Sequence, residues 1–314
     1  MSVVVIGSVF VDIKGYPLDT FEPTGRNAGR MEEMHGGVAR NMVEDIANAQ
    51  LRPIFLGLVD ESGAGMSVVK HLREQKVNVD YMRAAPDGMG TWLAIFDPEG
   101  DVFASVSKRP NLTPIADILD EQGDEIFQKA DSILLEMDLE DKVLYKALEL
   151  AEKYSVPVYA AVSNMTVALQ RRDLLRRLDC FVCNQQEAGI LFVEDFSSKK
   201  PRELREILAA RVEAAEIKAM VITMGGQGAV YAARGGESGV VPPKKVAVMD
   251  TTGAGDAFMA GVTIGLTYGK SLREACGIGT TLAAAVISSL SNVCPLFRPR
   301  ELGLDIPGDL PDVL

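Results

Sequence analysis

Short apolar runs recur along the chain, and between them apolar residues follow a helical period. VVVIG, residues 3–7, is a continuous run rich in β-branched residues, which is typical of a strand buried on both faces. Similar runs begin at Pro53, Ser132, Val156, Cys180 and Ala219. Helical patterns cover 41–50, 65–75, 142–154, 167–178 and 201–215. The alternation predicts an α/β fold, with a parallel sheet covered by helices on both faces.

The predicted topology also indicates where a ligand would bind. In open α/β sheets ligands bind beyond the carboxyl ends of the strands. The functional site is therefore expected in the loops that follow Gly7, Asn184, Gly225 and Asp250.

Two segments break the alternation. Residues 12–33 are polar and lack a helical period, and residues 91–106 form two strand-like runs around the turn-forming DPEG. We expect these segments to form a small separate β-sheet that acts as a lid over the main site. The chain is thus interpreted as a single domain. Its core spans about 1–11, 34–87 and 111–314, and its lid about 12–33 and 88–110.

Composition narrows the classes of partner. The chain has 314 residues and a net charge of −12, from 44 acidic and 32 basic residues. This charge repels phosphate backbones, so nucleic acid is not an expected partner. Apolar runs stay below the ~18 residues that a membrane span needs. The apolar first residues lack a basic leader and are interpreted as a strand, not as a signal peptide.

Cysteine usage points to a reducing compartment. Cys180 and Cys183 form a C-x-x-C, which also occurs in redox and zinc sites. They lie on a predicted strand, however, where residues three apart point to opposite faces. The four cysteines show no disulfide pattern, which favours the cytoplasm.

Two nucleotide-binding motifs can be excluded. The dinucleotide fingerprint G-x-G-x-x-G is missing after the first strand, which argues against a Rossmann oxidoreductase. GLTYGKS, residues 265–271, has the wrong spacing for a phosphate loop and follows a helix instead of a strand. The two histidines, His35 and His71, are too few for a histidine metal cluster, and His71 is expected on a helix surface.

The segment DTTGAGDAF, residues 250–258, combines small and acidic residues before an apolar helix. A strand-like run, KVAVMD, leads into it. At Gly253, Ala254 and Gly255 the backbone N–H groups can converge at the positive end of the helix, which makes an anion-binding site. Asp256 lies inside it. This carboxylate could simply cap the helix, or it could accept a proton from a hydroxyl that attacks a bound phosphate.

With these residues the chain resembles the PfkB, or ribokinase-like, family of carbohydrate and nucleoside kinases. DTTGAGDAFMAG is similar to the family's C-terminal signature and GGVARN, residues 36–41, to its Gly-Gly signature. G-S-x-x-x-D, N-x-x-E and T-x-G-x-x-G begin at Gly7, Asn184 and Thr223. The five motifs follow the family's order over almost the whole chain. The resemblance implies a ribokinase-like three-layer sandwich with a mostly parallel sheet.

The resemblance also implies a role for each matching residue. Asp256 would be the catalytic base, and the N–H groups of Gly253, Ala254 and Gly255 the anion hole for the γ-phosphate. The acceptor hydroxyls would be held by Asp12, Gly36, Gly37 and Asn41. The ATP site would comprise Asn184, Thr223, Gly225 and Gly228, with Glu187 near magnesium. Asp250 and Thr252 match positions that help to bind a monovalent cation such as potassium in several members.

Each of these residues has a structural alternative when it is taken alone. Gly225 and Gly228 could be hairpin glycines, Asn41 a helix cap, and Glu187 a surface acid in the first turn of a helix. These alternatives do not explain why the motifs occur together and in order.

The family's chemistry agrees with the composition. Phosphoryl transfer needs positioning and charge neutralisation, and an acidic chain without a phosphate-loop lysine needs Mg²⁺ with ATP. The lid would exclude water, which competes with the acceptor. Relatives often pair through the lid, so a homodimer formed there is expected. The free edges of a hairpin would permit this pairing.

The expected acceptor is a small molecule, a nucleoside or a sugar. GGVARN with its Arg40, and the MGGQGAVY run, resemble the branch that phosphorylates pseudouridine on its 5′-hydroxyl. Pseudouridine is therefore the expected acceptor. Lid residues would decide the choice, with Lys14, Thr91, Trp92 and Asn111 as candidates.

Two departures concern the nucleotide side and the substrate. The family often has Lys-Pro before N-x-x-E and Asp-Pro after the middle strand, where this chain has residues 182–183 and 160–162. Two alternative functions stay open. One is a sugar kinase acting on ribose, fructose or a related ketose, and the other is a sugar or nucleoside sensor without catalysis.

Overall fold

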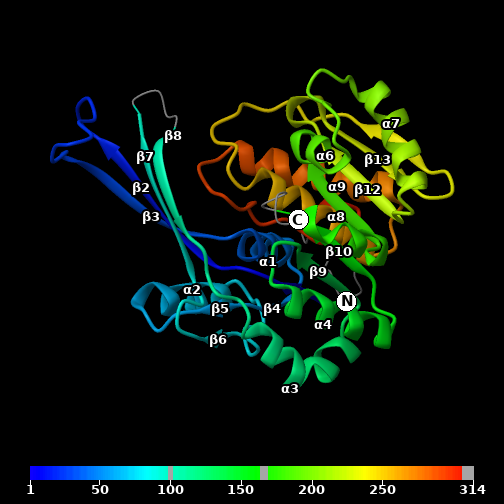
Figure 1. Cartoon of the computed structure of the whole chain (residues 1–314), viewed down its shortest axis with the longest axis horizontal. Helices are drawn as coiled ribbons and strands as arrows, with labels where there is room; N and C mark the ends of the chain where they lie inside the picture. The colour runs from blue at the N-terminus through cyan, green and yellow to red at the C-terminus, as the bar shows by residue number, and fades with distance from the viewer. Residues whose placement is uncertain (98–101, 163–168, 306–314) are drawn as a thin grey trace, which may run out of the picture.

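The computed structural model describes residues 1–97, 102–162 and 169–305. A central sheet runs through the protein (Figure 1). Its strands lie in the order β14 (Ser238–Val241), β13 (Ala229–Ala233), β12 (Ala219–Thr223), β11 (Cys180–Asn184), β10 (Val158–Ala161), β9 (Ser132–Glu136), β1 (Val3–Ile6) and β4 (Ile54–Leu56). From β4 to β12 neighbouring strands are parallel, and β13 and β14 add an antiparallel edge. The predicted mostly parallel sheet is confirmed.

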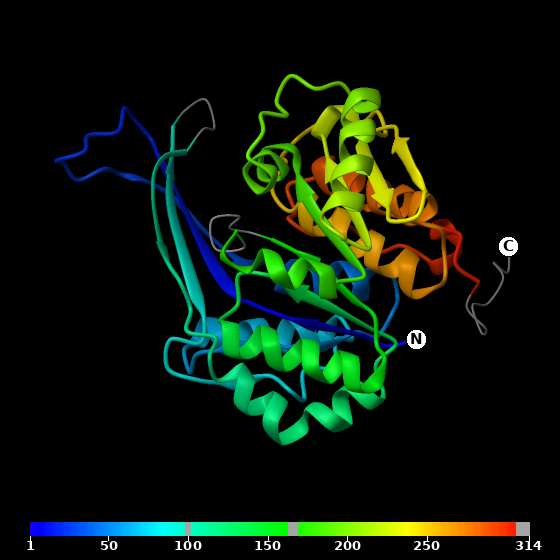
Figure 2. The same ribbon diagram turned by 45° about the vertical axis from the view of Figure 1, so that its right-hand side comes forward.

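Helices cover both faces of this sheet, as Figure 2 shows. Side chains of β1 alternate between two cores, with Val4 and Ile6 in one and Val3 and Val5 in the other. The first core includes side chains of α3 (Ile115–Gln128), α4 (Asp141–Tyr154), η1 (Leu169–Arg177), α6 (Gln185–Phe192) and α7 (Pro201–Ala214). The second includes side chains of α1 (Val38–Asn48), α2 (Gly63–Glu74), α8 (Ala254–Thr267) and α9 (Leu272–Ile287).

A second sheet projects from the main body (Figures 1 and 2). Its strands lie in the order β3 (Gly29–Gly36), β2 (Phe10–Pro17), β7 (Gly90–Phe96) and β8 (Val102–Lys108). They come from the two segments that break the strand–helix alternation, so the expected small separate sheet is confirmed. The smaller elements are β5 (Leu58–Val59), β6 (Arg83–Ala84), η2 (Gly225–Gln227) and η3 (Pro299–Leu302).

The cysteines are all buried free thiols. Cys180 belongs to one core and Cys183 to the other, as the strand period predicted. None of the helices in the described part of the chain is long and apolar enough to cross a membrane.

The structure corrects several predicted elements. KVAVMD is not a strand, because Pro242 and Pro243 follow β14 and cannot donate ladder hydrogen bonds, and Val248 is 62% exposed. Helices α3 and α9 were not among the predicted helices. The helix expected over 167–178 is a 3₁₀ helix at Leu169–Arg177, and its first two residues lie outside the described residues, as does most of the DPEG turn.

Helices α8 and α9 pack closely through small residues. A Cβ atom placed on Gly261 would lie 2.5 Å from Cα of Gly279, and one on Gly265 would lie 2.5 Å from Cα of Ala275. Larger side chains would force the helices apart. Because α8 begins at the predicted anion-binding segment, this contact fixes the helix that carries it.

Gly261→Ala should lower the free energy of unfolding by about 1–3 kcal/mol, because the added methyl group overpacks the helix contact. Gly277→Ala in α9 is the matched control, since its Cβ atom would meet nothing within 4 Å. That variant should be neutral or more stable by up to about 1 kcal/mol. Urea unfolding measures both, and equal stability of the two variants would contradict the close contact.

Candidate active site

The predicted site residues gather at the carboxyl ends of the central strands. Asn184 ends β11 and Thr223 ends β12, and the two face each other across the parallel ladder. Ser8 follows β1, and Glu136 ends β9. The site therefore lies at the edge of the sheet that the topology predicted.

The Gly36–Gly37 turn brings β3 against the end of β1. Gly37 has φ = 100°, and a Cβ atom there would lie 2.7 Å from the carbonyl oxygen of Ser8. A side chain on Gly36 would collide with the Asp12 carboxylate. Both glycines are needed for close approach, and they place Asp12 next to the start of α1.

Asp256 and Asn41 meet although 215 residues separate them. The Asn41 side-chain amide donates a hydrogen bond of 2.7 Å from Nδ2 to Asp256 Oδ2. Asn41 is 5% exposed, and its Oδ1 has no hydrogen-bond partner within the described residues. Burial raises the pKa of Asp256 to about 7, although Asn41 and Arg40 lower it. This carboxyl group can therefore exchange a proton near neutral pH.

The first turn of α8 presents backbone N–H groups beside Asp256. Gly253 precedes the helix with φ = 81°, and a side chain there would collide with the Asn292 carbonyl oxygen. The Ala254 N–H donates to the carbonyl oxygen of Thr251 at 3.2 Å. The N–H groups of Gly253 and Gly255 donate to no group in the described part of the chain. The predicted anion site thus has two uncommitted donors, not three.

Asp250 joins this segment to the second sheet. Its Oδ1 accepts hydrogen bonds of 2.8 Å from the N–H and the hydroxyl of Thr252. Its Oδ2 lies 3.9 Å from Nζ of Lys14, which is on β2. Burial alone would raise the pKa of Asp250, but the Thr252 hydrogen bonds and Lys14 lower it. The residue is an anion held between α8 and the second sheet.

Asn184 and Glu187 form a capping box at the start of α6. Asn184 Oδ1 accepts the Glu187 N–H at 2.8 Å, and Glu187 Oε2 accepts the Asn184 N–H at 2.7 Å. Burial raises the pKa of Glu187. The helix-start alternative for this pair is therefore realised, while the second carboxylate oxygen of Glu187 makes no protein hydrogen bond in the described residues.

The loop after β12 is shaped by two glycines with positive φ. Gly225 has φ = 52° and opens η2, and Gly228 has φ = 91°. A side chain on Gly228 would collide with the carbonyl oxygen of Val241. The turn lies beside Thr223, so these three predicted nucleotide-site residues are neighbours.

Glu136 is a buried carboxylate at the same edge of the sheet that the motifs did not reveal. It lies at the end of a buried strand, where it accepts hydrogen bonds of 2.9 Å from Ser8 N and 2.8 Å from Ser8 Oγ. Burial and the charge of Asp138 raise its pKa to about 7. A carboxylate that closes an otherwise apolar strand, SILLE, was the available signal.

Arg40 belongs to a buried charge cluster beneath the Gly36–Gly37 turn. Its Nη1 lies 2.6 Å from Glu44 Oε2, and its guanidinium also donates to the carbonyl oxygens of Gly36 and His35. His71 lies on helix α2, as expected, with its side chain 34% exposed, and its Nε2 lies 2.7 Å from Glu44 Oε1. Charge pairing explains why Arg40 and Glu44 are buried, and Arg40 holds the Gly36–Gly37 turn in place.

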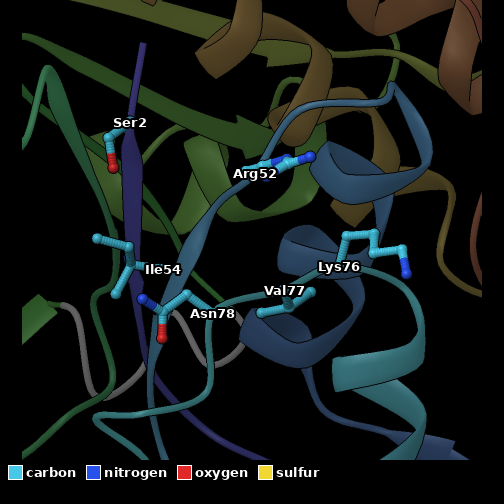
Figure 3. A pocket seen from close by; sticks show the side chains of 6 residues that line it. All are labelled: Ser2, Arg52, Ile54, Lys76, Val77 and Asn78. Atoms are coloured by element: carbon cyan, nitrogen blue, oxygen red, sulfur yellow. The ribbon is translucent and has the colours of Figure 1, made fainter.

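Two further observations concern metal binding and a hollow away from this site. Within the described residues, no three His, Cys, Asp or Glu side chains are grouped so that they could hold a metal ion. A hollow lies at the opposite, amino-terminal ends of β1 and β4 (Figure 3). It is lined by Ser2, Arg52, Ile54, Lys76, Val77 and Asn78.

The chain is similar to known proteins over most of its length. The pfkB family carbohydrate kinase model matches residues 1–294. Guanosine-inosine kinase of Exiguobacterium acetylicum is 34% identical over 292 residues, which cover 92% of this chain and 95% of that protein. Pseudouridine kinase of Escherichia coli is 28% identical over 310 residues, which cover 95% of this chain and 97% of that protein.

The fold has solved counterparts. Arabidopsis thaliana ribokinase, in complex with ribose and ATP, superposes with a TM-score of 0.82 at 19% identity, over 96% of this chain and 97% of that one. The ribokinase-like fold is thereby confirmed. The family model spans nearly the whole chain and includes the strands, the second sheet and the first turn of α8. The chain belongs to the pfkB family of carbohydrate kinases and is a phosphotransferase.

Proposed function

We propose that the protein transfers the γ-phosphoryl group of ATP to the 5′-hydroxyl of a nucleoside. The observation that carries this proposal is the Asn41–Asp256 hydrogen bond beside the uncommitted N–H groups of Gly253 and Gly255. A proton acceptor and an anion site lie together there, and phosphoryl transfer to an alcohol requires both.

In this reaction Asp256 accepts the proton of the attacking hydroxyl. The new bond joins the acceptor oxygen to the γ-phosphorus, and the bond from that phosphorus to the leaving ADP oxygen breaks. The N–H groups of Gly253 and Gly255 stabilise charge on the transferred group, with Ala254 holding the turn. Asp256 can act as a base near neutral pH because burial raises its pKa to about 7.

The acceptor is proposed to lie between β2 and α1. Asp12, Gly36, Gly37 and Asn41 would hold its ribose hydroxyls. Asn41 Oδ1 is a buried acceptor without a partner in the described residues, and a substrate hydroxyl would satisfy it. Arg40 donates a hydrogen bond to the carbonyl oxygen of Gly36. This contact fixes the orientation of the peptide groups in the Gly36–Gly37 turn.

ATP is proposed to lie along the ends of β11 and β12, against Asn184, Thr223, Gly225 and Gly228. Magnesium commonly binds one or two carboxylates together with substrate phosphates, so the second oxygen of Glu187 suits it. When bound, Mg²⁺ would neutralise phosphate charge. Asp250 and Thr252 stay proposed ligands of a monovalent cation, with Asp250 acting through Oδ1, the oxygen that faces Thr252.

The relatives favour two classes of nucleoside acceptor. The 34% identity to a guanosine-inosine kinase points to purine nucleosides, and the 28% identity to a pseudouridine kinase points to pseudouridine, the acceptor expected from the motifs. The main alternative is a sugar kinase for ribose, fructose or a related ketose, because ribokinases are also relatives. A sensor without catalysis would have no use for a base with the proton affinity of Asp256.

ADP release with Mg²⁺-ATP and a panel of acceptors separates these functions. Guanosine, inosine or pseudouridine should give a kcat/KM at least about 100-fold above that for ribose and fructose. The reason is that the nucleobase of the acceptor supplies additional binding energy in the transition state. Efficient turnover of ribose with no nucleoside turnover would contradict the nucleoside proposal.

Asp256→Asn should lower kcat about 100- to 10,000-fold, since the amide cannot accept the proton. Calorimetry should still detect acceptor binding, because the side chain keeps its shape. The matched control is Asp195→Asn, a carboxylate in the loop after α6, which should leave kcat unchanged. A wild-type rate no higher than that of Asp256→Asn would favour the sensor.

The pH dependence follows from the raised pKa of Asp256. The base must be deprotonated, so kcat/KM should fall about tenfold per pH unit below a midpoint near pH 7 and level off above it. Glu136 also titrates near pH 7, so Glu136→Gln serves as the control and should keep this limb. Loss of the limb in that variant would assign it to Glu136 instead.

We also propose that two copies pair through the second sheet. Leu93, Phe103 and Val106 expose 41%, 55% and 72% of their surface on its strands. Pairing would cover this apolar area. Sedimentation velocity should show a dimer, and a monomer at micromolar concentration would contradict the pairing.

A further inference from the structure

Lys14 is a buried cation that the proposed chemistry does not use. It lies on β2 and is 7% exposed. Its Nζ lies 3.9 Å from Asp250 Oδ2, which is an ion pair but too long for a hydrogen bond. Within the described residues the ammonium makes no hydrogen bond, although it carries three donors. A buried ammonium group with unused donors needs a further acceptor.

Asp250 offers the complementary group beside it. Its Oδ1 is occupied by the N–H and hydroxyl of Thr252, so the carboxylate cannot turn freely. Its Oδ2 faces Lys14, at a distance too long for a hydrogen bond to the ammonium. The two side chains therefore present a hydrogen-bond donor and an acceptor next to each other.

Aromatic rings lie next to this pair. The ring centroid of Phe96 is 5.7 Å from Nζ of Lys14. Trp92 meets Phe96 edge-on with centroids 6.3 Å apart, and Tyr16 stacks on Phe96 at 5.2 Å. All three rings are only partly buried. They form an apolar wall against which a flat ring can pack.

The position of Lys14 along β2 indicates which part of a ligand reaches it. Asp12 and Lys14 are two residues apart on one strand, so they share a face and are about 7 Å apart. Val11 and Ile13 pack on the other face, against the second core. If Asp12 holds the ribose, as the proposed function states, Lys14 lies one step outward, at the distance of the attached base.

We propose that Lys14 and Asp250 together bind the lactam edge of the acceptor's base. The ring carbonyl would accept a hydrogen bond from Lys14, and the adjacent ring N–H would donate to Asp250, with the base against Phe96. Guanine, hypoxanthine and uracil rings, including that of pseudouridine, carry this edge. Adenine and cytosine carry the reversed pattern, with an amine facing the ammonium and a lone pair facing the carboxylate. The inference rests on the proposed nucleoside kinase activity and adds selection of oxo-bases.

The first test uses the unaltered protein and three nucleosides that differ at this edge. Inosine carries the lactam, adenosine the reversed pattern, and 1-methylinosine keeps the carbonyl but lacks the ring N–H. ADP release should give a kcat/KM for inosine about 100-fold or more above that for adenosine. The value for 1-methylinosine should fall at least about tenfold below that for inosine.

Lys14→Met tests the donor while keeping the apolar stem. It should lower kcat/KM for inosine about 10- to 100-fold and leave that for adenosine within about threefold, so that the selectivity collapses. Lys108→Met is the matched control, since Lys108 lies on β8 of the same sheet with its side chain 52% exposed, and it should keep the selectivity.

The results distinguish a failure of base selection by Lys14 and Asp250 from a failure of the proposed nucleoside kinase activity. If inosine and adenosine react at similar rates, the nucleoside kinase stands and base selection by this pair is wrong. If Lys14→Met reduces both nucleosides equally, Lys14 acts on the phosphates or on folding, and the inference is again overturned. If no nucleoside reacts, both the proposed function and this inference fall.

Discussion

The hydrogen bond between Asn41 and Asp256 is the contact on which the proposed site depends. It joins the first turn of α1 to the first turn of α8, two elements 215 residues apart in the chain. Each helix begins at a glycine with positive φ, Gly37 and Gly253, whose side chain would collide with a backbone oxygen of another segment. The missing side chains let the start of α1 pack against Ser8 and the start of α8 pack against Asn292. Burial of the carboxylate between them raises its pKa into the range that a base at neutral pH needs.

Charge is distributed in a way that suits an anionic ligand in an acidic protein. The net charge is −12, yet the proposed anion site consists of backbone N–H groups, which carry no net charge. The buried cations are held near it by specific carboxylates, Arg40 by Glu44 and Lys14 by Asp250. Arg40 donates three hydrogen bonds and holds the Gly36–Gly37 turn, whereas Lys14 donates none within the described residues. This difference separates a residue that supports the site from one that can contact a ligand.

The sequence predicted the sheet and the separate small sheet, because buried parallel strands leave continuous apolar runs and the second sheet interrupted their alternation with helices. Asn41, Asp256 and the glycines were found because their motifs are short and local. Glu136 was missed because it closes an apolar strand and because its hydrogen-bond partner, Ser8, is 128 residues away in the chain. The Ala254 N–H was expected to be free, but it donates to the carbonyl oxygen of Thr251 in a local turn. The periodicity of apolar residues cannot show such a hydrogen bond. The exposed KVAVMD run was wrongly predicted to be a strand. Its β-branched residues favour an extended chain, but a strand also needs a neighbouring strand with which to pair.

A crystal structure with a nucleoside and a non-hydrolysable ATP analogue bound with Mg²⁺ would show whether Asp256 is placed to act as the base. The acceptor's 5′-oxygen should lie about 2.6–3.2 Å from the Asp256 carboxylate. The terminal phosphate should lie against the N–H groups of Gly253 and Gly255, as expected if Asp256 is the base. A 5′-oxygen beyond hydrogen-bond reach of Asp256, or a terminal phosphate bound away from the first turn of α8, would contradict this role of Asp256.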